Sequence, residues 1–303
     1  MYHSFYGLVQ SPFEMTPDPA FLYLGDSHRE GLATLVYGVQ ARKGFVLLTG
    51  EIGTGKTTLL HALLAQLDRE TLSALIFNPR LEPLDFFHVL FDELGIEERC
   101  HTKGEYLLAL NRFLIGRLER NLTTLLIVDE AQTLSPEMLE EIRLLSNLET
   151  PTSKLLQILL VGQPELWEML ALPRLRQLRQ RVVLRHQLRP FTEEETAAYV
   201  QERLRLAGYT GKGIFKSAAL RRVHDVSGGT PRVVNIVCDG ALLLGFARGK
   251  DTLGADAITE VARDLGLVDG VSFSESAAES SQAPSHRRRG LLGFFRSRQV
   301  GEV

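Results

Sequence analysis

One short stretch limits what this chain can fold into more than any other feature. Residues 50–57 read Gly-Glu-Ile-Gly-Thr-Gly-Lys-Thr and match the pattern GxxxxGK[ST]. An apolar run at 45–48 precedes them, and a Leu-rich pattern of helical spacing follows them. Strand, loop and helix in this order predict a loop whose backbone N–H groups converge on phosphate oxygens at a helix N-terminus. An ordinary Gly-rich turn with an exposed lysine is the alternative, and the flanking strand and helix argue against it.

The chain up to about residue 190 repeats this alternation of strand and helix. Further short apolar runs predict strands at 74–77, 125–128, 156–161 and 182–184. Helical spacing predicts intervening helices, one from Ser27, where Ser27 and Glu30 are expected to form a capping box, others near 84–94 and 105–119, and one from Ser135-Pro136. Continuous apolar runs are typical of buried parallel strands. The pattern therefore predicts an α/β fold with a doubly wound sheet.

The strand patterns stop after about residue 190, which indicates a change of domain. From there the chain reads as helices, with expected caps at Thr192 (paired with Glu195), Ser217 and Thr230-Pro231. Beyond about 270 the composition shifts to Ser, Ala and Glu, and then to basic and aromatic residues. We expect a nucleotide-binding α/β domain at 1–190, a helical domain at 191–268, and a flexible tail at 269–303.

Composition excludes several classes of protein. The 303 residues are 44% hydrophobic and 23% charged, as in ordinary globular proteins, and the net charge of -3 argues against a surface that is basic throughout. Cys100 and Cys238 lie far apart, without the spacing of a zinc site or a disulfide framework. No signal peptide and no run approaching roughly 18 apolar residues is visible. We therefore expect a cytoplasmic protein.

The phosphate loop assigns roles to a set of residues. Lys56 is expected to neutralise the β- and γ-phosphates of ATP, and the Thr57 hydroxyl is expected to bind Mg²⁺. The full set of expected nucleotide-binding residues in this loop is Gly50, Glu51, Ile52, Gly53, Thr54, Gly55, Lys56, Thr57 and Thr58.

Two carboxylates follow the apolar run at 125–128. Asp129 and Glu130 stand at the carboxyl end of a strand, where ligands of open α/β sheets bind. We expect Asp129 to hold Mg²⁺, directly or through water, and Glu130 to orient and polarise the attacking water. Such a pair is common in solvated loops, which is the alternative. The presence of the phosphate loop favours a role in binding metal and water.

Two further residues are candidates for reading the γ-phosphate. Arg232 follows Thr230-Pro231 at the start of a helix, where a cation opposes the helix dipole and an anionic ligand offsets that cost. Gln163 follows the strand at 156–161, which we expect to lie beside Asp129 in the sheet. A tolerated surface arginine and an ordinary loop glutamine are the alternatives.

Arginines gather before and within the last predicted strand. One of them is expected to act as an arginine finger in a neighbouring subunit, with Arg181 ranked first and Arg179 second. A solvated basic face is the alternative for most of the set, which is Arg174, Arg176, Arg179, Arg181, Arg185 and Arg189.

Together these motifs resemble the general secretion pathway A (ExeA-like) family of AAA+ ATPases, which is similar to the ATPases of pilus and exopolysaccharide loci. The resemblance covers about residues 1–266. It rests on motifs at 5–8, 12–13, 16–19, 21–23, 27–29, 44–57, 128–132 (Val-Asp-Glu-Ala-Gln), 161–166 (Val-Gly-Gln-Pro-Glu-Leu), 178–181 (Leu-Arg-Gln-Arg) and 228–232 (Gly-Gly-Thr-Pro-Arg).

The resemblance implies a P-loop NTPase (AAA+) fold with a five-stranded parallel sheet and a C-terminal helical lid domain. It implies ATP and Mg²⁺ at their junction, with Gln163 as sensor 1, Arg232 as sensor 2 and Arg181 as the finger in a ring or filament of this chain. Members of the family often continue into a transmembrane helix and a periplasmic peptidoglycan-binding domain. This sequence shows neither pattern, so we expect no direct remodelling of the cell wall.

Three functions remain open. The first is an ATPase that assembles on a membrane-associated secretion, pilus or polysaccharide-export apparatus from the cytoplasmic side and remodels it. The second is a DNA-associated regulator that resembles transposition target-selection ATPases, and the net charge disfavours nucleic acid as a partner. The third is a slow nucleotide-dependent switch that recruits a partner. Basic and aromatic residues at 286–298 would suit peripheral contact with an anionic inner membrane, and a disordered end is the alternative.

Overall fold

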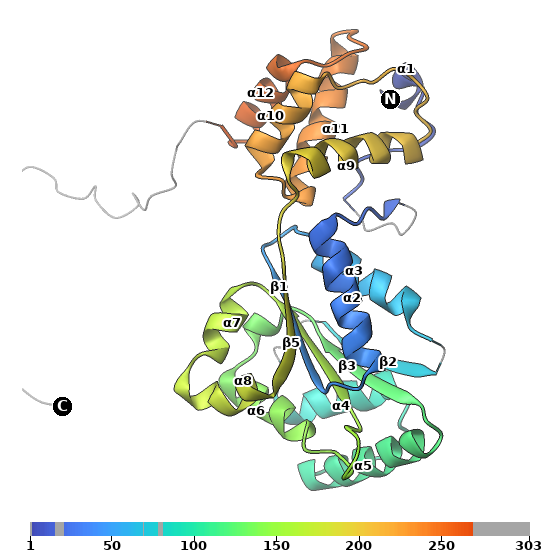
Figure 1. The fold of residues 1–303 in the computed structure, drawn as a ribbon, viewed down its shortest axis with the longest axis vertical. Coiled ribbons are helices and arrows are strands. Elements are labelled where there is room, and N and C mark those ends of the chain that lie inside the picture. The colour runs from blue at the N-terminus through green and yellow to red at the C-terminus, as the bar shows by residue number, and fades with distance from the viewer. Residues whose placement is uncertain (1, 16–20, 69, 78–80, 269–303) are drawn as a thin grey trace, which may run out of the picture. The chain divides into compact units, whose positions relative to one another are not determined.

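A parallel sheet organises the first part of the molecule. The computed structural model describes residues 2–15, 21–68, 70–77 and 81–268 (Figure 1). All strand pairs are parallel, and the sheet order is β2-β3-β4-β1-β5. The strands are β1 (Phe45–Gly50), β2 (Thr71–Ile76), β3 (Thr123–Val128), β4 (Gln157–Gly162) and β5 (Val182–Leu188). The expected five-stranded parallel sheet is therefore confirmed.

Helices connect the strands and then form the C-terminal part of the described chain. In the first part they are α1 (Tyr2–Tyr6), α2 (Asp26–Gln40), α3 (Lys56–Gln66), α4 (Pro83–Leu94), α5 (Lys103–Glu119), η2 (Ala131–Thr133), α6 (Pro136–Leu145), α7 (Glu165–Leu170), η3 (Pro173–Leu175) and α8 (Arg176–Arg181). The later helices are α9 (Glu193–Leu206), α10 (Ser217–Ser227), α11 (Pro231–Ala247) and α12 (Ala255–Asp264). Within the described ranges, none of these helices has the length and apolar character needed to cross a membrane.

The two faces of the sheet bury alternate residues of the same strands. In β1, Phe45 and Leu47 pack with α4, α5 and α6, whereas Val46 and Leu48 pack with α2 and α3. Every residue of β1 and β4 is buried, as the continuous apolar runs indicated. Side chains that alternate across a sheet with helices on both faces give three layers. The doubly wound architecture follows from this arrangement.

The helices after β5 share a core with the N-terminal segment. Val200, Val237 and Ile258 from α9, α11 and α12 are fully buried, and Tyr6 and Phe13 pack against the same cluster. The aromatic N-terminal segment therefore covers the helical region. We retain the division into domains at 1–190 and 191–268 as a proposal. The expected tail at 269–303 and the motif residues 16–19 lie outside the described residues.

Helix caps were predicted with mixed success. Thr192 accepts from the backbone of Glu195 and forms the expected capping box, and Ser135 caps α6. The capping box at Ser27 was wrong, because α2 begins one residue earlier and the Ser27 hydroxyl instead accepts the N–H of Arg189. The cap at Ser217 was also wrong, because Lys216 is the N-cap and no side chain caps that helix.

Candidate functional site

The loop at 50–57 has the backbone that the motif requires. β1 ends at Gly50 and α3 begins at Lys56. Gly53 and Gly55 adopt φ values of +80° and +99°, which glycine reaches without steric cost. A Cβ at Gly55 would lie 3.0 Å from Nε2 of His28, which itself donates to the Thr54 carbonyl at 2.8 Å. The loop is thus shaped by its glycines and supported from α2.

Lys56 is directed along this loop. Its ammonium donates to the carbonyls of Gly50 at 2.8 Å and Glu51 at 3.1 Å. Burial lowers the pKa of Lys56, while the nearby carboxylates of Glu130 and Asp129 act in the opposite sense. A largely desolvated ammonium that loses water contacts interacts strongly with an anion placed beside it.

The acidic pair lies at the carboxyl end of β3. Asp129 is buried, and burial raises the pKa of its carboxyl group even though one oxygen accepts the Glu130 N–H at 2.8 Å. Glu130 is exposed and has φ of +51°, a conformation uncommon for residues other than glycine. The two neighbours therefore have different environments, one enclosed and one open to solvent.

A single cavity brings the candidate groups together. It has a volume of about 390 Å³, and Lys56, Glu130 and Arg232 all line it. The other predicted nucleotide-binding residues in its lining are Ile52, Gly53, Gly55, Thr57 and Thr58. Gly50, Glu51 and Thr54 stand in the same loop, where their carbonyls accept from Lys56 and His28.

Arg232 reaches the cavity from the helical region. α11 begins with Pro231 after the N-cap Thr230, and the Arg232 N–H donates to the Gly53 carbonyl at 3.2 Å. A Cβ at Gly53 would lie 2.7 Å from Cβ of Arg232. The N-terminus of α11 therefore contacts the phosphate loop, and the two helix N-termini of α3 and α11 converge on one cavity.

Gln163 lies one residue beyond β4, beside the acidic pair in the sheet order. Its backbone N–H donates to Oε1 of Gln132 at 3.1 Å, and the Gln132 amide donates to Glu130 at 2.6 Å. Gln163 is thereby linked to Glu130 through Gln132.

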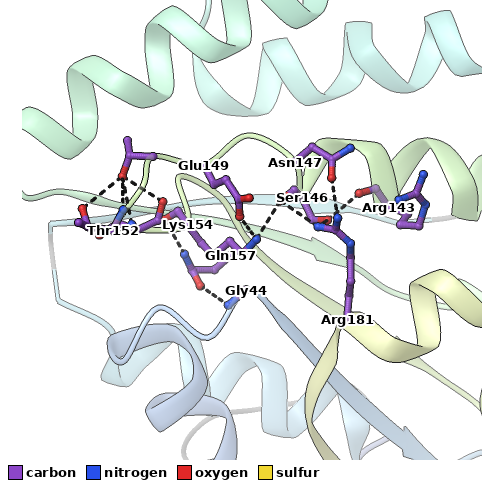
Figure 2. Close-up of polar contacts among 11 residues, drawn as sticks. Gly44, Arg143, Ser146, Asn147, Glu149, Thr152, Lys154, Gln157 and Arg181 are labelled. Carbon is purple, nitrogen blue, oxygen red and sulfur yellow. Dashed lines mark hydrogen bonds and ion pairs between the residues drawn. The ribbon is translucent and has the colours of Figure 1, made fainter.

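Arg181 lies near the amino ends of the strands, where it contacts Ser146 and Asn147 (Figure 2). It precedes β5, whose first residue, Val182, pairs with Phe45 at the start of β1, while the phosphate loop follows the other end of β1. Five residue steps along β1, at about 3.3 Å each, separate the amino and carboxyl ends of the strand by roughly 17 Å. The guanidinium donates to the Ser146 hydroxyl and the Asn147 amide oxygen, both at 2.7 Å. Arg181 therefore cannot reach the cavity of its own chain.

Arg179, the second candidate, is held on an indole ring. Its guanidinium lies 4.6 Å from the centroid of Trp167, and that of Arg185 lies 4.1 Å from the same ring. Burial and, less strongly, the nearby charge of Arg179 lower the pKa of Arg185. The structure thus separates both arginines from the cavity lining.

Comparison with known proteins identifies the family at this point. The family model described as "AAA domain" matches residues 39–170. The chain is 46% identical over 251 residues to general secretion pathway protein A of Aeromonas hydrophila, and the alignment covers 82% of this chain and 46% of that protein. The chain is an AAA-domain protein related to general secretion pathway protein A. It spans about half the length of that relative.

Solved structures of AAA+ proteins share the fold of this chain over a longer stretch than the matched AAA domain. The ORC2 protein of Aeropyrum pernix matches with a TM-score of 0.60 and 14% identity, covering 82% of this chain and 72% of that one. Cdc6p from Pyrobaculum aerophilum matches with 0.62 and 18%, covering 82% and 71%. The RuvB Holliday junction branch migration motor of Thermotoga maritima matches with 0.52 and 19%, covering 80% and 70%. At such identities the likeness shows the fold alone.

The donor groups of the AAA domain fit a magnesium ion. Mg²⁺ prefers hard oxygen ligands and is commonly held in nucleotide sites by one or two protein oxygens together with phosphates. The Thr57 hydroxyl borders the cavity, and the buried Asp129 carboxylate lies close enough to Lys56 for each to shift the pKa of the other. These two residues would hold the ion, as the sequence predicted.

Aromatic residues that line the cavity were not among the predicted site residues. Phe191, Tyr23 and Tyr199 form a cluster in which the ring centroids are 5.5 Å apart for Phe191 and Tyr23, 5.1 Å for Phe191 and Tyr199, and 5.6 Å for Tyr23 and Tyr199. Phe21 also lines the cavity, with the buried Arg203 guanidinium 4.6 Å from its ring. Three separate segments supply these rings, so only the density of aromatic residues in the N-terminal segment could have pointed to part of the cluster.

Proposed function

We propose that this chain binds ATP with Mg²⁺ and hydrolyses it. The main observation in support is that one cavity is lined by Lys56 at the start of α3, Glu130 after β3 and Arg232 on α11. Phosphoryl transfer needs positioning and charge stabilisation more than covalent chemistry, and these three groups supply both.

Each residue has a distinct task in this proposal. Backbone N–H groups of the glycine loop and the Lys56 ammonium bind the β- and γ-phosphates. Thr57 and Asp129 hold Mg²⁺, which offsets the negative charge on the phosphates. The exposed carboxylate of Glu130 orients a water molecule and accepts its proton. Arg232 contacts the γ-phosphate and thereby ties α11 to the nucleotide state.

The aromatic end of the cavity suits the base of the nucleotide. Tyr23, Phe191 and Tyr199 line the same cavity as Lys56 and Thr57, and the three rings lie against one another. A flat, largely apolar base packs well against such rings. We assign the base to these rings and the phosphates to the glycine loop.

The cellular role that we propose is assembly on a secretion, pilus or polysaccharide-export apparatus. The relation to general secretion pathway protein A supports it, and a cytoplasmic place, peripheral at the inner membrane, is part of the proposal. Self-association into a ring or filament belongs to the proposal, because Arg181 is too far from its own cavity and can serve as the arginine finger only in a second copy of the chain. Residues 286–298, proposed as a membrane contact, lie outside the described residues.

One observation favours the second candidate, a DNA-associated regulator. Among the described residues, Arg176, Arg179 and Arg185 make no ion pair with a carboxylate, whereas Arg174 and Arg189 face Glu137 and Glu30 at 4.0 and 3.7 Å. Unpaired arginines on an exposed face are available to phosphates. Trp167, the only tryptophan of the chain, lies against two of them, so its fluorescence reports on binding there.

The test is ATP turnover measured against protein concentration, alone, with duplex DNA and with anionic liposomes. Turnover per subunit that rises with concentration supports self-association, and stimulation by DNA together with a salt-dependent change in Trp167 fluorescence supports the second candidate. Glu130→Gln protein should retain ATP and turn it over only at a small residual rate. Calorimetry that detects no magnesium-dependent binding of ATP or ADP to folded protein would refute the proposal.

A further inference from the structure

The side chain of Gln132 is hydrogen-bonded at both ends of its amide. Oε1 accepts the backbone N–H of Gln163 at 3.1 Å, and Nε2 donates to Oε2 of Glu130 at 2.6 Å. Gln132 stands on η2, Gln163 directly after β4 and Glu130 directly after β3. One side chain therefore connects the carboxyl ends of two neighbouring strands.

The chemistry of the partners determines the orientation of this amide. A backbone N–H only donates, so the amide oxygen of Gln132 must face Gln163. The amide nitrogen then faces Glu130, and an ionised carboxylate is an acceptor at all its positions. Both contacts are satisfied by one orientation, and a flipped amide would place like groups against each other at both ends.

The backbone of Glu130 is held, whereas its side chain depends on Gln132. The Glu130 N–H donates to Asp129, its carbonyl accepts from the N–H and the hydroxyl of Thr133, both at 2.9 Å, and its φ is +51°. The side chain itself is exposed, and Gln132 is its hydrogen-bond partner among the described residues. Without that contact, a glutamate with several rotatable bonds would sample many positions in solvent.

We propose that Gln132 is a positioning residue that orients the Glu130 carboxylate toward the attacking water. It also couples the orientation of this carboxylate to the backbone of the loop after β4. The inference rests on the proposed ATP hydrolysis. One carboxylate oxygen accepts from Gln132, which leaves the other free to accept a proton from water. Any displacement of the backbone at Gln163 moves the amide of Gln132 and, through it, the carboxylate. Gln163 therefore acts on Glu130 through its backbone.

The chain leaves room for this amide at Gly162. A Cβ at that position would lie 2.6 Å from Oε1 of Gln132 and 3.0 Å from a methyl group of Leu166. Any larger residue would displace the amide from the position in which it contacts both partners. Gly162→Ala thus perturbs the Gln132 contact without altering Gln132.

The first test replaces Gln132 by an apolar residue of similar length. Gln132→Met should lower kcat by about 10- to 100-fold, because a misaligned catalytic group loses a factor of this order. KM and the calorimetric Kd for ATP should stay within about 2-fold of wild type, since Gln132 does not line the cavity. Gln66→Met, the same change at the exposed end of α3, should leave both unchanged. A wild-type kcat in Gln132→Met protein would overturn the inference.

Two further variants separate positioning of Glu130 from simple support of the loop. Gln132→Glu still accepts the Gln163 N–H but sets a second carboxylate against Glu130, so kcat should fall at least as far as in Gln132→Met. Gly162→Ala should also lower kcat with little change in Kd. Wild-type kcat in the Gln132→Glu protein would show that the contact to Glu130 is not the operative one.

A double-mutant cycle completes the test. If Gln132 acts through Glu130, adding Gln132→Met to Glu130→Gln lowers kcat no further, whereas independent structural effects would multiply. Multiplying effects, or equal losses in kcat and ATP affinity, would count against the inference. Failure of the proposed function is distinct, because wild-type protein would then show no turnover at all.

Discussion

Asp129 is a carboxyl group whose ionisation the fold disfavours. It is 5% exposed, and burial raises the pKa of its side chain despite the Glu130 N–H and the nearby ammonium of Lys56. A raised pKa means that the folded protein holds this proton more tightly than the unfolded chain does. Stability is therefore reduced at pH values above the folded pKa of Asp129 and recovers as the pH falls through it. Asp129 therefore lowers the stability of the fold at neutral pH, which is consistent with the metal-binding role that we propose for it.

Asp129→Asn should accordingly stabilise the fold while removing function. Asn keeps an oxygen that accepts the Glu130 N–H but carries no charge to desolvate. A gain of about 1 kcal/mol would raise Tm by about 2–4 °C at neutral pH without nucleotide. The difference from wild type should shrink as the pH is lowered, since the wild-type carboxyl then becomes neutral, and magnesium-dependent ATP binding should be lost. Scanning calorimetry at several pH values measures the first effect, and a lower Tm for Asp129→Asn at neutral pH would contradict it.

Replacement of Lys56 should weaken ATP binding. Its ammonium is buried against the carbonyls of Gly50 and Glu51, so it is preorganised along the loop that we assign to phosphates. Charge-assisted hydrogen bonds of about 1.5–3 kcal/mol are lost in Lys56→Ala, which corresponds to about a 10- to 100-fold weaker Kd for ATP. Titration calorimetry measures it, with Lys212→Ala at an exposed position as the control. Equal affinity of both variants would remove Lys56 from the site.

At the scale of elements, the turn before α11 fixes how that helix meets the strand region. Gly228 and Gly229 both have positive φ, and the Gly229 carbonyl accepts the N–H of Phe191 at 2.9 Å. A Cβ at Gly229 would lie 2.0 Å from the Phe191 carbonyl oxygen, whereas a Cβ at Gly228 would meet nothing within 4 Å. The second glycine therefore provides close backbone contact, and the first only a left-handed turn.

The pair of alanine variants tests this distinction. Gly229→Ala combines a left-handed alanine with a collision against backbone that is itself hydrogen-bonded, so it should cost about 2–4 kcal/mol. Gly228→Ala should cost about 1–2 kcal/mol, the price of the left-handed conformation alone. Urea denaturation gives both free energies of unfolding. Equal losses in the free energy of unfolding would mean that the backbone at Phe191 moves to accommodate the new methyl group without added strain. Gly229→Ala should also weaken ATP binding, because Arg232 follows three residues later on the same turn.

Elements whose signals are local were predictable from sequence, and those set by tertiary contacts were not. β1, β3 and β4 are buried on both faces, so their apolar runs identify them. β5 was predicted over 182–184 but extends to Leu188. Among the described strands it pairs with β1 alone, and it alternates exposed and partly covered residues such as Arg185 and His186. The aromatic rings of the cavity come together only through folding, so no local pattern marks them as a site.

At the scale of the whole molecule, the sheet separates Arg181 from the cavity. The contacts to Ser146 and Asn147 hold the guanidinium near the amino ends of the strands (Figure 2). The phosphate loop follows the carboxyl end of β1. If Arg181 contributes to hydrolysis, it must therefore do so in a second copy of this chain. An edge-to-edge arrangement of copies would place the amino edge of one near the carboxyl edge of the next, as in a head-to-tail ring or filament.

Mixing of inactive variants tests whether the site is shared. Arg181→Ala protein keeps its own phosphate loop but lacks the arginine, and Lys56→Ala protein keeps the arginine but lacks the loop lysine. Each alone should lose at least about 10-fold in turnover, and the mixture should regain part of it, because an Arg181→Ala cavity that faces a Lys56→Ala neighbour is complete. Arg176→Ala, at an exposed position on the same helix, should retain wild-type turnover and serves as the control for charge loss. The mixture is measured over a range of ratios, at concentrations where wild-type turnover per subunit has reached its plateau. If its turnover equals the mean of the two variants, all catalytic groups lie on one chain. Arg181 would then have only its contacts to Ser146 and Asn147.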